Sequence, residues 1–303
     1  MEALRVTRMT HADPWPALPL KEWQPTYDAV HLWTQVVGKV RMSLAHPLNH
    51  WWQVALYLTS RGLTTSPVPC SWGMFEMQFD FIEHELQIHT SDGAGRRLPL
   101  RAEPVSAFYG RVMDALEALE IQVAIDTKPQ EIPDTTPLDQ DDRPREYDRD
   151  AMNRCWRIFA STADALEEFR GRFIGKCSPV HFFWGSFDVT CTRFSGRKAP
   201  PRKGVISGPG YSHEDNSAGF WPGGSGIEGP AFYAYHAPTP EGLSEEKIGP
   251  AAAAWNSRLG EFILMYDDVR ASKHPRAALM EFLETTYAAG AKRAGWDRSA
   301  LES

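Results

Sequence analysis

Two stretches of this chain carry the same order of residue types. The first spans residues 38–63 and the second spans residues 175–197. Each begins with Gly-Lys and continues through a proline to a histidine followed by large aromatic residues. Each then runs through a strand-like segment into a Thr/Arg/Ser/Gly cluster. Such a repeat predicts two similar halves packed as a pseudo-dimer around a central cleft, and binding sites favour such junctions.

The composition is that of a globular protein. The 303 residues are 42% hydrophobic and 23% charged, which is ordinary for a folded domain and long enough for about two of them. The net charge of −7 comes without a block of Lys or Arg, so we expect no nucleic-acid partner. The four cysteines show no paired spacing and no apolar run reaches bilayer length. We therefore expect a cytoplasmic protein without a membrane partner. The sequence leaves the oligomeric state open.

Composition along the chain divides it into four parts. Residues 1–26, rich in Pro and Trp, predict an N-terminal arm packed on the body. Residues 27–126 and 150–303 each read as helix, antiparallel strands, helix, which is an α+β pattern. Residues 127–149 are rich in Pro, Asp, Glu and Thr and have few apolar side chains to bury, so they predict a linker.

Hydrophobic periodicity places the individual elements. The strict alternation of Phe75, Met77, Phe79 and Phe81 with polar residues is the clearest strand signal. In the first half we expect a helix from Asp28 to His46-Pro47, strands at 52–58, 75–81, 85–90 and 96–101, a helix from Pro104 and an edge strand at 121–125. In the second half we expect a helix over 152–173, strands at 180–194, 231–236 and 261–266, and a helix from Pro275.

Residues 204–230 combine many glycines with three large aromatic side chains and several reactive ones. We interpret them as a long loop without secondary structure. Such loops are uncommon in compact domains and are often functional. This loop is therefore predicted to form a lid over the cleft.

The candidate catalytic residues come from this loop and from the strand before it. Histidine transfers protons near neutral pH, and a partly desolvated carboxylate acts as acid or base. The predicted catalytic set is His181, His213, Glu214 and Asp188. In a regular strand His181 and Asp188 point to opposite faces unless a bulge, for example at Gly185, intervenes.

The predicted substrate-binding set combines one basic residue with aromatic walls and a hydroxyl. Arginine holds carboxylate or phosphate groups in a bidentate manner, and aromatic side chains line most small-molecule pockets. The members of this set are Arg193, Trp184, Phe220, Trp221, Tyr233, Tyr235 and Ser212.

A metal cofactor is the alternative for the same residues. His181, His213 and Glu214, with His236 as a further donor, are ligand types that suit iron or zinc. The Gly-rich segments lack a Walker or dinucleotide-binding pattern, and Ser212 lacks the Gly-x-Ser-x-Gly frame. The sequence therefore disfavours a nucleotide cofactor and a serine nucleophile.

Several longer motifs resemble one bacterial family. They are Leu32-Trp-Thr-Gln35, Pro47-Leu-Asn-His-Trp-Trp52, Ser60-Arg-Gly-Leu63, His181-Phe-Phe-Trp-Gly-Ser-Phe-Asp188 and Ser212-His-Glu with Phe220-Trp-Pro-Gly223. Together they resemble the family called domain of unknown function 5996, over nearly the whole chain. The resemblance implies a bacterial cytoplasmic protein of about this length and implies no activity or catalytic residue.

These observations favour an enzyme that performs acid–base chemistry on a small anionic or aromatic molecule, with hydrolysis as the default reaction. A mononuclear iron or zinc enzyme is the first alternative. A non-catalytic protein that binds a hydrophobic or anionic small ligand is the second. Convergence of at least two candidate polar side chains distinguishes an enzyme from a binding protein.

Overall fold

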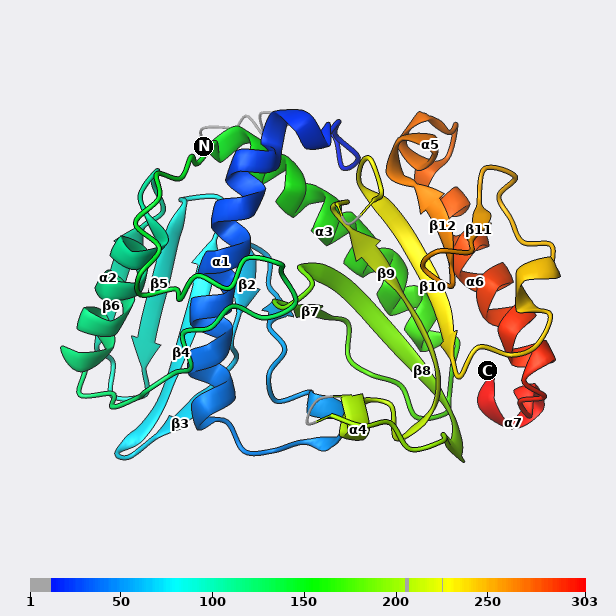
Figure 1. Cartoon of the computed structure of the whole chain (residues 1–303), viewed down its shortest axis with the longest axis horizontal. Helices are drawn as coiled ribbons and strands as arrows, with labels where there is room; N and C mark the ends of the chain where they lie inside the picture. The colour runs from blue at the N-terminus through cyan, green and yellow to red at the C-terminus, as the bar shows by residue number, and fades with distance from the viewer. Residues whose placement is uncertain (1–11, 205–206, 225) are drawn as a thin grey trace, which may run out of the picture.

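The computed structural model describes residues 12–204, 207–224 and 226–303. Within them the fold is mixed α and β, with two antiparallel sheets of six strands each. Figure 1 shows the sheets side by side, that of the first half in cyan and that of the second in green to orange. The α+β prediction with antiparallel sheets is confirmed at this level.

In chain order, one helix precedes the strands of the first half and another follows them. The strand order in the sheet is β1-β2-β4-β5-β6, and β3 pairs with β4. The elements are α1 (Leu20–Leu44), the short 3₁₀ helix η1 (Asn49–Trp51), β1 (Tyr57–Leu58), β2 (Gly62–Thr64), β3 (Val68–Cys70), β4 (Gly73–Asp80), β5 (Glu85–Thr90), β6 (Gly95–Pro99) and α2 (Val105–Glu117).

The second half has a sheet with the order β11-β12-β10-β9-β8-β7, in which β12 lies between β10 and β11. Its elements are α3 (Arg149–Gly171), β7 (His181–Phe183), β8 (Asp188–Lys198), α4 (Ser207–Gly210), β9 (His213–Trp221), β10 (Ala231–Ala237), η2 (Leu243–Glu245), β11 (Ala254–Asn256), β12 (Glu261–Met265), α5 (Tyr266–Ala271), α6 (Pro275–Arg293) and α7 (Arg298–Leu301). Asp148 caps α3 by accepting from the backbone N–H groups of Asp150 and Ala151.

Three predictions in the first half were wrong. Helix α1 begins at Leu20 rather than Asp28 and contains Pro25 in its second turn. The strand predicted over 52–58 is reduced to β1, since left-handed backbone at His50 and Trp51 makes a turn before it. Residues 121–125 pair with no strand. The first of them, Ile121, is nevertheless buried.

Two predictions in the second half were also wrong. The single strand expected over 180–194 is a hairpin, in which Trp184 to Phe187 turn between β7 and β8. The long loop expected over 204–230 contains β9, which pairs on both sides and lies at the centre of the sheet. Its many polar residues concealed the strand alternation. Part of the predicted loop, residues 205–206 and 225, lies outside the described residues.

The two halves meet edge to edge through one pair of residues. Leu56 donates to the carbonyl of Phe182 at 2.9 Å, and Phe182 donates back to the carbonyl of Leu56 at 2.8 Å. Beside this pair the indole of Trp184 packs against Gly38 of α1 and donates to the carbonyl of Val54 at 2.7 Å. The halves are thus joined by both backbone pairing and side-chain packing.

The repeated motifs adopt different structures at their aligned histidines. His50 lies in a 3₁₀ turn with a φ of 56°, whereas His181 begins strand β7. The duplication and the pseudo-dimer therefore remain predictions.

The second sheet has one apolar face and one polar face. Helices α3 and α6 cover the apolar face, where Val189, Cys191 and Phe232 are fully buried. The alternate residues of β8, β9 and β10 point to the opposite face. No helix of the described residues combines the length and apolar character that crossing a bilayer requires.

We predict that Gly38→Ala destabilises the protein. An added Cβ atom would lie 2.2 Å from Trp184 Cδ1, so the indole must move, which costs about 1–3 kcal/mol. The measurement is urea unfolding. The control is Gly110→Ala in α2, where no atom lies within 4 Å of the new Cβ. Alanine should stabilise that helix by about 0.5–1 kcal/mol. Equal effects of the two changes would contradict this account.

Candidate functional site

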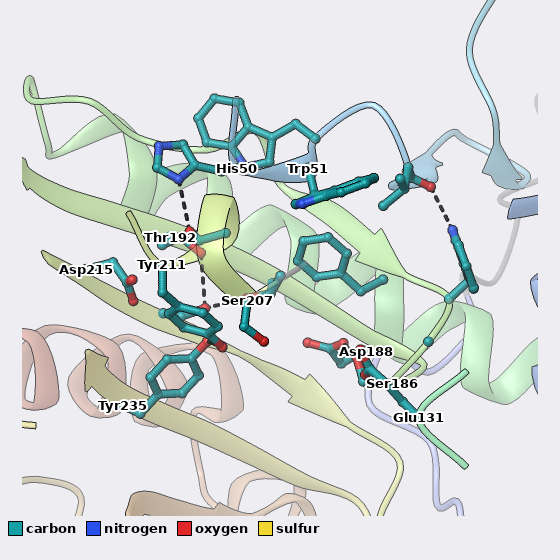
Figure 2. A pocket seen from close by; sticks show the side chains of 18 of the residues that line it. His50, Trp51, Glu131, Ser186, Asp188, Thr192, Ser207, Tyr211, Asp215 and Tyr235 are labelled. Atoms are coloured by element: carbon teal, nitrogen blue, oxygen red, sulfur yellow. Dashed lines mark hydrogen bonds between the residues drawn. The ribbon is translucent and has the colours of Figure 1, made fainter. Parts of the chain in front are cut away.

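A cavity of about 700 Å³ lies on the polar face of the second sheet. Its floor is made by alternate residues of β8, β9 and β10, and its walls come from the segment around η1, from residues 130–131 and from α4. Figure 2 shows the side chains that converge on it. The cavity therefore lies where the first half, the connecting segment and the second sheet meet.

Asp188, at the start of β8, is one of two buried acids among the described residues of the cavity. One of its carboxylate oxygens accepts a hydrogen bond from the hydroxyl of Ser186 and the other accepts one from Tyr233. Burial raises the pKa of Asp188, and the two hydroxyl donors oppose this by stabilising the carboxylate. Gly219 permits the Tyr233 contact, because a Cβ there would lie 2.8 Å from the Tyr233 hydroxyl oxygen.

The charge of Asp188 raises the pKa of two further carboxyl groups. Glu261, in β12, has a pKa raised to about 7 by burial and by Asp188. Glu131 lies at the rim on the connecting segment, where desolvation and Asp188 also raise its pKa. Its backbone is left-handed, with a φ of 58°, a conformation that non-glycine residues seldom adopt and that often marks functional sites. This end of the cavity therefore carries three interacting acids.

Asp215 is the fourth acid that the described residues bring to the cavity. Its side chain is only 2% exposed, and its Oδ1 atom has no hydrogen-bond partner. Burial raises its pKa to about 8, so it is mostly protonated at neutral pH. Nearby, the hydroxyl groups of Tyr211 and Tyr235 lie 3.1 Å apart. Asp215 can therefore donate a proton at neutral pH, and the rings of Tyr211 and Tyr235 line the same cavity.

His50 closes one wall and is held in one orientation. Its Nδ1 lies 3.0 Å from the carbonyl of Gly210, and its Nε2 lies 2.7 Å from Nζ of Lys176. Burial and the Lys176 charge lower the pKa of His50. The neutral ring therefore donates from Nδ1 and accepts from Lys176 at Nε2, which links η1 of the first half to α4 and Lys176 of the second.

Five predicted site residues line the cavity. They are Asp188, Trp184, Trp221, Tyr233 and Tyr235. The remaining predicted residues are not among those that line it. In a single regular strand His181 and Asp188 would point to opposite faces. The hairpin instead pairs His181 with Thr190 and Phe183 with Asp188. Because cross-strand partners share a face, His181 and Asp188 lie on the same face of the sheet.

His181 is nevertheless sealed from the cavity. It is fully buried, its ring lies against Phe183 with centroids 4.4 Å apart, and its Nδ1 lies 2.8 Å from the carbonyl of Pro179. Burial lowers its pKa to about 4, so the ring is neutral. His213 packs edge-on against the ring of His50, with ring centroids 5.7 Å apart, and is hydrogen-bonded to the hydroxyl of Ser212.

Glu214, Arg193 and Phe220 lie on the helix-covered face. Glu214 forms an ion pair with Arg197 at 2.6 Å and accepts from Trp296. Arg193 is 1% exposed, stacks on the ring of Phe169 and donates to that residue's carbonyl. Phe220 packs against Phe159 in the core. Strand alternation explains all three positions, since each is out of phase with the cavity-facing residues.

The predicted metal ligands do not converge. His213 and Glu214 are neighbours on β9 and point to opposite faces, and His181 is enclosed elsewhere. No group of three His, Cys, Asp or Glu side chains suited to a metal ion occurs in the described part of the chain. The donor set therefore does not fit the iron or zinc site that the sequence suggested, and no step is derived through one.

The sequence analysis missed Glu131, Asp215 and Glu261 as site residues. Asp215 carried a usable signal, because Asp215, Ser217, Gly219 and Trp221 alternate at strand spacing. The interpretation of residues 204–230 as a loop concealed this alternation. Glu261 was placed in a strand, but nothing indicated which face it occupied. Glu131 lies in a segment without periodicity, so no local signal marks it.

Comparison with family models gives one match. The model described as Family of unknown function (DUF5996) matches residues 15–303. Comparisons with curated proteins and with solved structures gave no match. The match confirms the resemblance found in the sequence motifs.

We predict that Asp215→Asn stabilises the protein progressively as the pH rises from about 4 to about 8. The folded-state pKa of about 8 lies above the ordinary aspartate pKa of 3.8, which applies to the unfolded chain. Ionisation therefore costs the folded state stability across this window, by up to about 1.4 kcal/mol per pH unit. Asparagine does not ionise. Urea unfolding at several pH values measures the difference between the proteins.

The control for this prediction is Glu228→Gln, at an exposed position near the same sheet. It should follow the wild type at every pH. A constant difference between Asp215→Asn and the wild type across the window would show that Asp215 titrates normally.

Proposed function

The chain belongs to the family of unknown function DUF5996, and we propose that it is an enzyme that hydrolyses a small neutral or cationic molecule by acid–base chemistry. The observation that carries this proposal is the pair formed by Asp188 and Glu261 in the cavity. Two carboxyl groups whose pKa values are separated by their surroundings are the usual basis for an acid and a base in one site.

The two carboxyl groups have different surroundings. Asp188 receives hydrogen bonds from Ser186 and Tyr233, which favour its ionised form. No such donor reaches Glu261 from the part of the chain that the structure describes, and its pKa is about 7. A group with a pKa near the working pH transfers protons most effectively. Glu261 is therefore assigned as the residue that gives a proton to the leaving group.

In this scheme Asp188 accepts a proton from the attacking water while Glu261 protonates the departing atom. Water is thereby added across the cleaved bond, and the two carboxyl groups end the step with their protonation states exchanged. Proton exchange with solvent at the rim, where Glu131 lies, restores both groups. Pairs of carboxyl groups perform glycoside hydrolysis in this manner.

The charge of the cavity argues against the anionic substrate that the sequence analysis favoured. Arg193, the residue assigned to bind an anion, packs into the helix-covered core. Carboxyl groups line the cavity instead. The ionised Asp188 repels an anion, and its charge already disfavours ionisation of Glu131 and Glu261. Aromatic side chains supply apolar contact for a neutral or cationic substrate.

We predict that Glu261→Gln lowers kcat/KM by about 100-fold or more, as expected for loss of a general acid. The wild type should lose activity above about pH 7, as Glu261 loses its proton. The substrates are p-nitrophenyl esters, p-nitrophenyl glycosides and aminoacyl p-nitroanilides, each tested in neutral and cationic forms. Asp188→Asn should be equally impaired, and Glu228→Gln should match the wild type.

Wild-type turnover in both Glu261→Gln and Asp188→Asn would remove these residues from the reaction. Binding of these compounds can be measured by quenching of tryptophan fluorescence. Binding without turnover of any compound would favour the non-catalytic binding protein.

A further inference from the structure

The cavity has two acidic ends separated by an uncharged middle. Asp188 lies at one end and Asp215 at the other (Figure 2). Glu261 belongs to the Asp188 end, because the charge of Asp188 raises its pKa. Asp215 pairs across the sheet with Phe194, which lies at the far end of β8 from Asp188. At about 3.3 Å per residue, the backbones of Asp188 and Asp215 are roughly 20 Å apart along the strands.

The middle of the cavity presents hydroxyl groups and rings. Thr190 and Thr192 each place Oγ1 close to Oγ of Ser217, at 3.0 and 3.1 Å. Trp51 and Trp52 line the opposite wall. Such a surface suits an aliphatic chain with occasional polar atoms.

No Lys or Arg occurs among the described residues that line the cavity. Two basic side chains next to lining residues contact those residues. Lys176 is hydrogen-bonded to His50 and lies over the ring of Trp52, and Arg202 lies 4.0 Å from the ring centre of Tyr211. The charge of Arg202 acts on Asp215, although burial has the larger effect on its pKa. At the other end none of the described basic side chains offsets the charge of Asp188, and such a field favours a cation.

Asp215 adds an independent indication of a ligand. Its Oδ1 atom has no hydrogen-bond partner although the side chain is 2% exposed. Buried polar atoms in folded proteins are almost always paired, so an unpaired one that faces a cavity points to a donor supplied from outside.

We propose that the cavity binds a linear aliphatic polyamine, with one terminal ammonium group at Asp188 and Glu261 and the other at Asp215. Each ammonium group donates charge-assisted hydrogen bonds to a carboxylate and favours the ionised form, so Asp215 releases its proton to solvent when the amine binds. The rings supply apolar and cation–π contact along the chain. This assignment goes beyond the proposed function: it names a ligand of the same cavity, and a polyamine contains no bond that the proposed hydrolysis would cleave.

The test is calorimetric titration of the full chain at 150 mM salt, about physiological ionic strength, which suppresses unspecific attraction. The probes are spermine, putrescine and tetraethylene glycol, an uncharged chain about as long as spermine. We expect one spermine per chain, bound about tenfold more tightly than putrescine, because only spermine reaches both ends. A tenfold difference is the contribution of about one charge-assisted hydrogen bond. The glycol should not bind.

Two variants separate the ends of the cavity. Asp215→Asn should remove the advantage of spermine over putrescine. Glu261→Gln should weaken both amines, and it serves as the second variant if Asp215→Asn does not fold. Glu228→Gln should change neither affinity. Equal affinity for spermine and putrescine, or spermine binding that neither variant alters, would overturn the proposal.

The outcomes also separate this inference from the proposed hydrolysis. Polyamine binding with this pattern, but with no turnover of any tested substrate, would support the ligand class and refute the enzyme. Turnover of a neutral substrate that spermine does not inhibit would support the enzyme and refute the polyamine.

Discussion

The packing of Trp184 against Gly38 is the contact on which the rest of the structure depends. It lies where α1 of the first half meets the β7–β8 turn of the second. The same indole donates to Val54, and His31 of α1 donates to the carbonyl of Gly185 in that turn at 2.9 Å. Burial lowers the pKa of His31 to about 4, so this contact is made by a neutral ring. The turn is thus fixed from two directions, and Asp188, which follows it, is fixed with it.

This junction also creates the cavity. The polar face of a sheet is normally open to water, which would leave its carboxyl groups with ordinary pKa values. Here the segment around η1 and residues 130–131 cover that face. Desolvation then raises the pKa of Asp188, Glu261 and Asp215 together. The chemistry proposed for the site is therefore a consequence of how the halves are joined.

The acids of the cavity differ because their hydrogen-bond partners differ. Asp188 has two hydroxyl donors, whereas Oδ1 of Asp215 has no partner. Burying a carboxyl group without partners costs free energy, and protonation reduces that cost. The structure thus retains an unfavourable group at Asp215, which accords with a position kept for binding rather than for stability.

The sequence by itself determined the α+β class, the antiparallel character of β4 to β6 and the family, because alternation and motif order are local properties of a chain. It also placed Trp184, Trp221, Tyr233 and Tyr235 in one site. It did not determine that β9 is a central strand, because its polar residues resemble those of a loop. Only the tertiary structure decided which acids share the cavity. Glu131, Asp188, Asp215 and Glu261 come from segments far apart in the chain, and their pKa values depend on burial and on each other's charge, which no local pattern records.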